Sequence, residues 1–161
     1  MDLKPLPVGV DSFEHLITRG YYFIDKTWFI KELLDKKGNV NLFTRPRRFG
    51  KTLNMSMLQY FFEDMRTGNG EKKDNAILFK NMRIMEAGEA YLAHMGTYPV
   101  ISLTLKDAKQ PDFELAYEAI KRQIADAYFY HRYILQAESL SEKKEEYLNI
   151  MRRTADRSDY N

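Results

Sequence analysis

Apolar residues recur at helical spacing in several parts of the chain. The spacing predicts helices over 10–20, 26–38, 51–65, 86–96 and 112–128. Ser139 and Glu142 have the spacing of a capping box, which predicts a last helix that ends near Arg153. Asp25 stands before the second of these helices and can accept hydrogen bonds from its first N–H groups. The apolar positions 53, 57 and 61 lie on one face of the third helix, which we expect to pack on a sheet.

Three short runs have the composition of β-strands: GYYFID (20–25), NVNLFT (39–44) and YPVISLTL (98–105). The last run is too short and too apolar for a surface helix, so we expect it deep in a sheet. The run ILFKNMRIM (77–85) fits either a strand or a short helix, and the polar run 66–75 predicts a surface loop. The alternation of strands and helices predicts an α/β fold with a largely parallel sheet.

Composition narrows the class of protein. A chain of 161 residues with 44% hydrophobic and 30% charged residues is typical of one soluble globular domain over 1–161. The net charge of +2 is too small to indicate a nucleic-acid binder by overall charge. The chain has no cysteine, which fits a reducing cytoplasm, and its three histidines lack metal-ligand spacing. No apolar run is long enough for a signal peptide or a membrane span.

The loop between the second strand-like run and the third helix carries the clearest chemical signal. It approximates the phosphate-binding pattern G-x-x-x-x-G-K-[ST]. Gly50 would let the backbone approach phosphates, Lys51 would reach their β and γ oxygens, and the Thr52 hydroxyl would bind Mg²⁺. Arg45 replaces the first glycine, and Pro46 lacks a backbone donor. The candidate nucleotide-binding residues are Arg45, Pro46, Arg47, Arg48, Phe49, Gly50, Lys51 and Thr52.

Two other interpretations of this loop stay open. In the first, its cations neutralise the backbone of a nucleic acid while Phe43, Phe49 or Tyr22 stacks on bases. In the second, the loop is only a charged turn between core elements. The short length of the basic run and the low net charge argue against nucleic acid as the main partner. A Gly-Lys-Thr sequence at a helix start is also more specific than nucleic-acid binding requires.

The segment from Leu6 to Phe62 resembles the AAA-ATPase-like family of bacterial and archaeal proteins. The resemblance rests on FIDKT (23–27), RPRRFGKT (45–52), LFKNMRI (78–84) and YPVISLTLKDAK (98–109). It implies a P-loop NTPase-like fold, a mostly parallel sheet flanked by helices, followed in the family by a PD-(D/E)XK nuclease-like domain. It also implies that Lys51 holds phosphate, that Thr52 holds Mg²⁺, and that an arginine-rich loop is normal in the family.

The family's acidic metal-binding strand and its nuclease-like domain lie beyond the equivalent of Asn161. We therefore expect residues 1–161 to be an incomplete, N-terminal part that binds Mg-ATP but does not hydrolyse it efficiently alone. The acids best placed to substitute are Asp107 and Asp25, which are more simply explained as a solvated loop acid and a helix cap. The rival hypotheses are ATP hydrolysis that drives a nucleic-acid transaction in the longer protein, and a basic interaction module whose nucleotide site has decayed.

Overall fold

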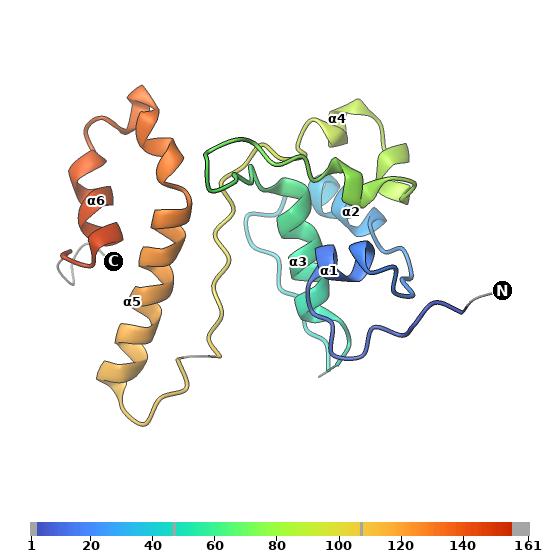
Figure 1. Cartoon of the computed structure of the whole chain (residues 1–161), viewed down its shortest axis with the longest axis horizontal. Coiled ribbons are helices and arrows are strands. Elements are labelled where there is room, and N and C mark those ends of the chain that lie inside the picture. Colours follow the sequence, from blue (N-terminus) through green and yellow to red (C-terminus); the bar gives the residue numbers. More distant parts are fainter. Residues whose placement is uncertain (1–2, 47, 107, 156–161) are drawn as a thin grey trace. The chain divides into compact units, whose positions relative to one another are not determined.

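The protein consists of helices joined by irregular segments. The computed structural model describes residues 3–46, 48–106 and 108–155. The chain divides into two compact units, residues 1–100 and residues 101–161 (Figure 1). The elements of the first unit are α1 (Phe13–Thr18), α2 (Trp28–Lys36), α3 (Lys51–Phe62), η1 (Ala76–Phe79), η2 (Arg83–Glu86) and α4 (Glu89–Leu92). Those of the second are α5 (Phe113–Tyr130), η3 (Arg132–Gln136), η4 (Glu138–Leu140) and α6 (Lys144–Arg152).

The core of the first unit forms where α1, α2 and α3 meet the 3₁₀ turns η1 and η2. Its buried members are Phe13, Ile30, Met57, Phe61, Leu78, Phe79 and Ile84. The ring of Phe79 lies 5.0 Å from that of Phe13 and 5.4 Å from that of Phe61, which places one aromatic side chain between two helices. Complete burial of each ring contributes about 1.5–3 kcal/mol, so this cluster holds α3 against α1.

The first turn of α1 is stabilised by a side-chain cap and by a hydrogen bond to α3. Ser12 is the N-cap, and its side chain accepts from the N–H of His15 at 3.3 Å. The N–H of Phe13 has no partner within its own helix and donates to Ser56 Oγ of α3 at 2.9 Å. One of the four open donors of α1 therefore fixes the position of α1 on α3.

A buried polar group ties the start of α2 to η2. Thr27 is fully buried, donates to Asp25 Oδ1 at 2.7 Å and accepts from the N–H of Ile84 at 3.1 Å. Asp25 Oδ2 also accepts from the N–H of Arg83 at 2.8 Å. Burial raises the pKa of Asp25, but the hydrogen bonds from Thr27 and Arg83 outweigh it and hold that pKa below its ordinary value.

A second polar group joins α1, α3 and the loop before η1. Glu14 accepts from Lys73 Nζ at 2.5 Å and from the Tyr60 hydroxyl at 2.9 Å. The hydrogen bond from Lys73, with help from Tyr60, holds the pKa of Glu14 below its ordinary value. Burial and the neighbouring carboxylate raise the pKa of Tyr60 to about 12. At neutral pH the Glu14 side chain is therefore a carboxylate and the Tyr60 side chain a neutral phenol.

The second unit is a pair of helices. Helices α5 and α6 lie side by side and run in opposite directions (Figure 1). The Tyr147 hydroxyl of α6 donates to the carbonyl of Tyr128 in α5 at 2.6 Å, and the two rings lie 4.5 Å apart. Asp112 caps α5 by accepting from the N–H of Leu115 at 2.9 Å. No helix in the part of the chain that the structure describes is long and apolar enough to cross a membrane.

The predicted α/β, P-loop NTPase-like fold with a parallel sheet is wrong for the residues that the structure describes, which form helices and no strand. Over those ranges, strand-type pairing is limited to two isolated bridges, Glu63 with Tyr98 and Arg66 with Lys72. The runs 20–25, 39–44 and 98–105 are irregular. Ile101 is 59% exposed, although we expected its run deep in a sheet. β-branched and aromatic residues favour a strand because their side chains pack well on a half-buried pleated sheet. A run of such residues forms no strand when no neighbouring segment pairs with it.

A helix forms in each of the five ranges predicted from helical spacing, but the observed ends differ from the predicted ones. The second helix begins at Trp28 rather than residue 26, and α4 is shorter than expected because it ends at Leu92. Helix α3 packs on α1 and the core instead of on a sheet. The capping-box prediction is wrong, because Ser139 lies within η4 and α6 begins only at Lys144. The ambiguous run 77–85 forms the 3₁₀ turns η1 and η2, separated by a short turn.

The first prediction concerns Thr27. The substitution Thr27→Val keeps the shape of the side chain but leaves the buried N–H of Ile84 without an acceptor. We expect it to lower the free energy of unfolding by about 1–3 kcal/mol, measured by urea denaturation. Thr97→Val is the control, because Thr97 is exposed and its hydroxyl donates to the carbonyl of His94 at 3.0 Å without serving a buried group. Equal stability of the two variants would contradict a structural role for Thr27.

The second prediction concerns the pH dependence of the Glu14 pair. A lowered pKa in the folded state stabilises the fold above the ordinary glutamate value near 4.5, and this contribution is lost as the pH falls through the folded value. Wild type should therefore exceed Glu14→Gln in unfolding free energy at neutral pH, and the difference should shrink below pH 4.5. Because Glu14 and Lys73 are both partly exposed, we expect this difference in unfolding free energy to be at most about 1 kcal/mol. Urea denaturation across this pH range measures it.

The exposed Glu71→Gln variant is the control for this comparison, since Glu71 lies in the loop 66–75. A constant difference between wild type and Glu14→Gln at all pH values would show that the ion pair with Lys73 does not lower the pKa.

Candidate phosphate-binding site

The backbone of the basic loop turns sharply just before α3. Arg48 and Gly50 both have left-handed conformations, with φ of 67° and 71°. Gly50 is the N-cap of α3, and no side chain caps this end of the helix. A left-handed residue other than glycine is uncommon, and the strain at Arg48 is of order 1 kcal/mol. The turn places Gly50 at the point where a ligand could approach the backbone most closely.

The start of α3 presents free backbone donors. The first backbone hydrogen bond of the helix runs from the N–H of Asn54 to the carbonyl of Gly50. Over the described ranges, the N–H groups of Lys51, Thr52 and Leu53 have no acceptor. The helix dipole adds a partial positive charge at the same end. Backbone geometry alone therefore favours an anion here.

A cavity of about 570 Å³ lies beside this end of α3. Its lining residues are Lys26, Phe29, Asn41, Phe43, Arg45, Phe49, Lys51, Asn54, Met55 and Leu58. Among the described residues that line the cavity, three are cations and none is a carboxylate. The volume falls in the range of small-ligand pockets, and the charge of the lining attracts an anionic ligand.

The lysine of the motif is in contact with the start of its own loop. Lys51 Nζ donates to the carbonyl of Arg45 at 2.5 Å. This hydrogen bond spans the loop and keeps the ammonium beside the cavity that both residues line. The ammonium of Lys51 has three N–H donors, and the Arg45 carbonyl accepts from one of them. Lys51 can therefore also donate to a bound phosphate without a large movement of its side chain.

Aromatic side chains form one wall of the cavity. The rings of Phe29 and Phe43 lie 5.0 Å apart in an edge-to-face arrangement, and Phe49 lines the cavity while remaining 63% exposed. Exposed ring faces next to cations can stack on a planar base. Of the aromatic residues considered from the sequence, Phe43 and Phe49 line the cavity, whereas Tyr22 does not.

The structure brings together part of the predicted residue set. The cavity is lined by Arg45, Phe49 and Lys51. The left-handed turn before α3 contains Arg48 and Gly50. Pro46 and Thr52 are exposed and are not among the lining residues. Thr52 follows Lys51 by about 100° around the helix, which explains why the two side chains point differently. Arg47 lies outside the described residues.

The two acids considered as metal ligands have different outcomes. Asp25 accepts from the N–H and the hydroxyl of Thr27 and from the N–H of Arg83, so its role is structural. The prediction that it caps the helix is wrong, because Thr27 is the N-cap of α2 and no side chain caps this helix. Asp107 lies outside the described residues. Within residues 3–46, 48–106 and 108–155, no group of three acidic or histidine side chains could hold a metal ion.

Sequence reasoning missed Lys26, Asn41 and Asn54 as lining residues. Asn54 could have been found, because it follows Lys51 by one helical turn and therefore shares its face. Lys26 lies in the FIDKT segment, but nothing in the sequence indicates that this segment reaches the loop 45–52. Asn41 donates to the carbonyl of Gly38 at 3.1 Å, a local turn contact that the sequence does not reveal.

Comparison with known proteins gives one family. The sequence profile of the AAA-ATPase-like family, described as "Predicted AAA-ATPase", matches residues 7–160. An uncharacterized protein encoded in the vnfD 5′ region of Azotobacter chroococcum mcd 1 is 41% identical over 64 residues. That stretch covers 38% of this chain and 12% of the relative, so the matched region is a small part of a longer protein. No solved structure matches.

A third prediction tests the left-handed glycine. No atom lies within 4 Å of a Cβ built on Gly50, so Gly50→Ala meets no clash and carries only the strain of φ at +71°. We expect a loss of about 1 kcal/mol in unfolding free energy. Gly68→Ala is the matched control, because Gly68 also has open space but lacks a positive φ. Urea denaturation that gave equal stability for both variants would contradict the conformation at Gly50.

Proposed function

The chain belongs to the family of predicted AAA-ATPases, and from this membership we propose that the loop 45–52 binds the phosphate groups of Mg-ATP. The observation that carries the proposal is the lining of the cavity beside α3. Among the described residues, this lining includes Lys26, Arg45 and Lys51 and no carboxylate, and it lies next to open backbone donors. A hydrogen bond to a charged group contributes about 1.5–3 kcal/mol, so three or four approach the ~8 kcal/mol of micromolar binding.

Each residue has a proposed task in binding. Lys51 exchanges the Arg45 carbonyl for phosphate oxygens, and the first N–H groups of α3 donate to the same phosphates. Phe43 or Phe49 stacks on the base. The exposed Thr52 hydroxyl is the proposed protein ligand of Mg²⁺. Because Mg²⁺ in such sites is held largely by phosphates and water, one protein ligand beside the nucleotide is chemically sufficient.

Hydrolysis is proposed for longer members of the family rather than for residues 1–161 alone. An attacking water needs an acid to orient it, and no carboxylate of the described residues lines the cavity. The relative from Azotobacter is much longer than the matched stretch, which is compatible with further catalytic groups elsewhere in such proteins. The lack of cysteine is consistent with action in a reducing cytoplasm.

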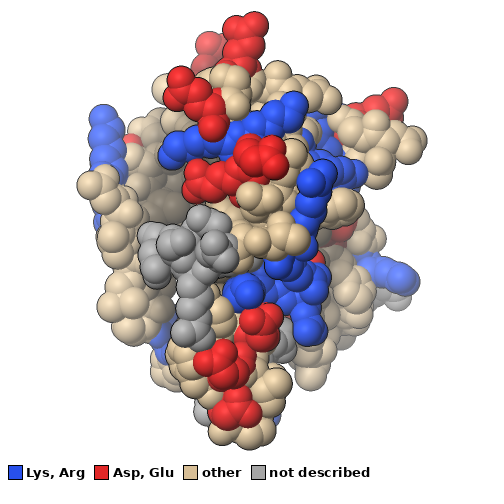
Figure 2. Space-filling model, turned by 90° about the vertical axis from the view of Figure 1, so that its left-hand side faces the viewer, with Lys and Arg blue, Asp and Glu red and all other residues tan. Residues whose placement is uncertain are grey.

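The nucleic-acid hypothesis is supported by the exposed ring of Phe49 beside the basic loop. Figure 2 shows one face of the molecule, on which acidic and basic side chains are interspersed. Against nucleic acid, the net charge of +2 supplies little general attraction for a phosphate backbone. We therefore rank a mononucleotide above nucleic acid.

The fourth prediction tests nucleotide binding. Mg-ATP should raise the melting temperature of the wild type, and Lys51→Ala should abolish the increase by removing the ammonium beside the loop. Calorimetry should give a loss of affinity of about tenfold or more for the variant. Titration with Mg-GTP shows whether the site prefers adenine.

Lys80→Ala is the control, because Lys80 is exposed and does not line the cavity. A single-stranded oligonucleotide that binds wild type but not Lys51→Ala, with no effect of Mg-ATP on either, would replace this proposal by the nucleic-acid hypothesis.

A further inference from the structure

The cavity beside the start of α3 follows one face of that helix. Four of its lining residues belong to α3, and their spacing of i, i+3, i+4 and i+7 is that of side chains on a single face: Lys51, Asn54, Met55 and Leu58. At 1.5 Å per residue, this face extends over about 10 Å from Lys51 to Leu58. The lining therefore changes along the helix from cationic to apolar.

This change in character matches the two ends of a mononucleotide. The cations Arg45 and Lys51 and the open N–H groups lie at the first turn of α3, where the proposed phosphates bind. The apolar lining, which includes Phe29, Met55 and Leu58, suits the faces of a planar base. A nucleotide with its phosphates at the first turn therefore has its base beside the middle of this helix face.

Asn54 stands where the cationic and apolar parts of the lining meet. It lies one helical turn after Lys51 and is partly exposed, and its side-chain amide has no hydrogen-bonding partner among the described residues. The other amide of the lining, that of Asn41, already donates to the carbonyl of Gly38 at 3.1 Å. Asn54 thus offers a ligand both a donor, Nδ2–H, and an acceptor, Oδ1.

A second cavity, of about 450 Å³, lies near the C-terminal end of α3. Gly96, which lines it, donates its N–H to the carbonyl of Phe61 in the last turn of that helix at 2.8 Å. Asn75 also lines this cavity, but both polar atoms of its side chain are buried, so a ligand in the cavity does not reach them. The second cavity therefore lacks an accessible amide of the kind that Asn54 provides.

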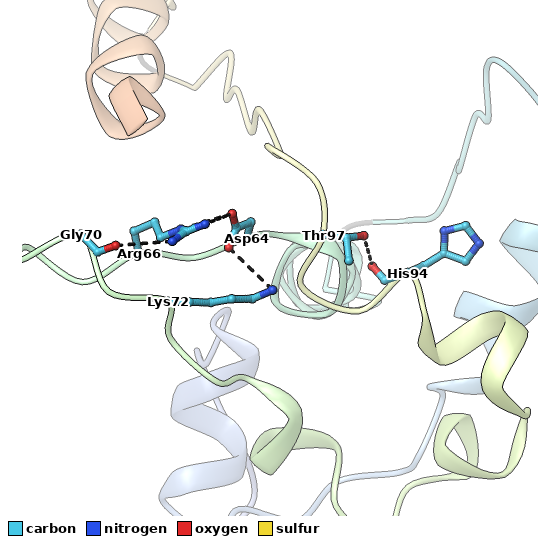
Figure 3. A network of polar contacts seen from close by, with 6 residues as sticks. All are labelled: Asp64, Arg66, Gly70, Lys72, His94 and Thr97. Atoms are coloured by element: carbon cyan, nitrogen blue, oxygen red, sulfur yellow. Dashed lines mark hydrogen bonds and ion pairs between the residues drawn. The ribbon is translucent and has the colours of Figure 1, made fainter. Parts of the chain in front are cut away.

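The lysines at the second cavity already have partners of opposite charge. Lys73 Nζ lies 2.5 Å from Glu14, and Lys72 Nζ lies 3.9 Å from Asp64 (Figure 3). A phosphate group would have to compete with these carboxylates. We therefore assign the nucleotide to the first cavity, whose described lining has cations and no carboxylate.

We propose that Asn54 binds the base of the nucleotide and selects adenine over guanine, an inference that rests on the proposed binding of Mg-ATP. The edge of adenine that carries N6 and N7 presents a donor beside an acceptor, whereas the same edge of guanine presents two acceptors. Oδ1 of Asn54 accepts from the N6 amino group of adenine, and Nδ2–H donates to N7. Guanine can use only the Nδ2–H donor, and its O6 faces the Oδ1 atom unfavourably.

The test measures by calorimetry the affinities of wild type and Asn54→Leu for Mg-ATP, Mg-GTP and Mg-7-deaza-ATP. 7-Deaza-ATP keeps the N6 amino group but carries C–H in place of N7. Wild type should bind Mg-ATP about tenfold or more tightly than Mg-GTP. It should also bind Mg-ATP about fivefold more tightly than Mg-7-deaza-ATP, because one hydrogen bond is lost. Asn54→Leu should bind all three with similar affinity.

Two controls separate base selection from phosphate binding and folding. Inorganic triphosphate carries no base, so wild type and Asn54→Leu should bind it equally. Asn69→Leu lies in an exposed turn outside the cavity and should keep the affinity ratios of wild type. Because residue 54 is partly exposed and leucine favours helix, urea denaturation should show that Asn54→Leu remains folded. The comparison of ATP with 7-deaza-ATP on wild type tests the same contact without any variant.

The outcomes distinguish this inference from the proposed function. Equal binding of Mg-ATP, Mg-GTP and Mg-7-deaza-ATP by wild type would overturn the role of Asn54 and leave the phosphate site in place. A preference for adenine that persists in Asn54→Leu would do the same. Loss of inorganic triphosphate binding in Asn54→Leu would assign Asn54 to the phosphates instead of the base. Failure of wild type to bind any nucleotide would overturn both proposals.

Discussion

The packing of α3 into the core is the interaction on which the rest of the first unit depends. Met57 and Phe61 are buried in the second half of the helix, and Phe79 lies against Phe61 and Phe13. At about 1.5–3 kcal/mol for each buried ring, this contact outweighs any hydrogen bond at the ends of the helix. Because the packed residues lie in the C-terminal half of α3, its first turn needs no partner for stability and can leave its N–H groups open.

The two cavities near the ends of α3 differ in the charge of the residues that line them. At the N-terminal end, Lys26 and two residues of the loop 45–52, Arg45 and Lys51, line one space, and no carboxylate of the described residues lines it. At the other end, Lys72 and Lys73 are paired with Asp64 and Glu14. The first arrangement concentrates positive potential where an anion can enter, whereas the ion pairs beside the second cavity offset the charge of its lysines.

Family membership and observed architecture contribute different information. The family profile extends over 7–160, so both compact units lie within the matched region. The observed helices, however, form their core without a sheet in the ranges that the structure describes, and Leu42 remains 85% exposed in a run with strand-like composition. Membership therefore supports nucleotide use at a coarse level, while the arrangement of Lys51 and the first turn of α3 supplies the physical argument for phosphate.

The sequence by itself determined most of the helices and the Gly50-Lys51-Thr52 part of the proposed phosphate-binding loop. Helical spacing and the Gly-Lys-Thr run depend on neighbours within one or two turns, so they can be recognised from the sequence alone. Only the tertiary structure decided that the strand-like runs stay unpaired, that Lys26 lines the cavity and that Thr52 does not. It also decided that the side-chain amide of Asn75 is buried without a hydrogen-bond partner among the described residues. Pairing, convergence and burial depend on residues far apart in the chain, and one sequence does not specify which of them meet.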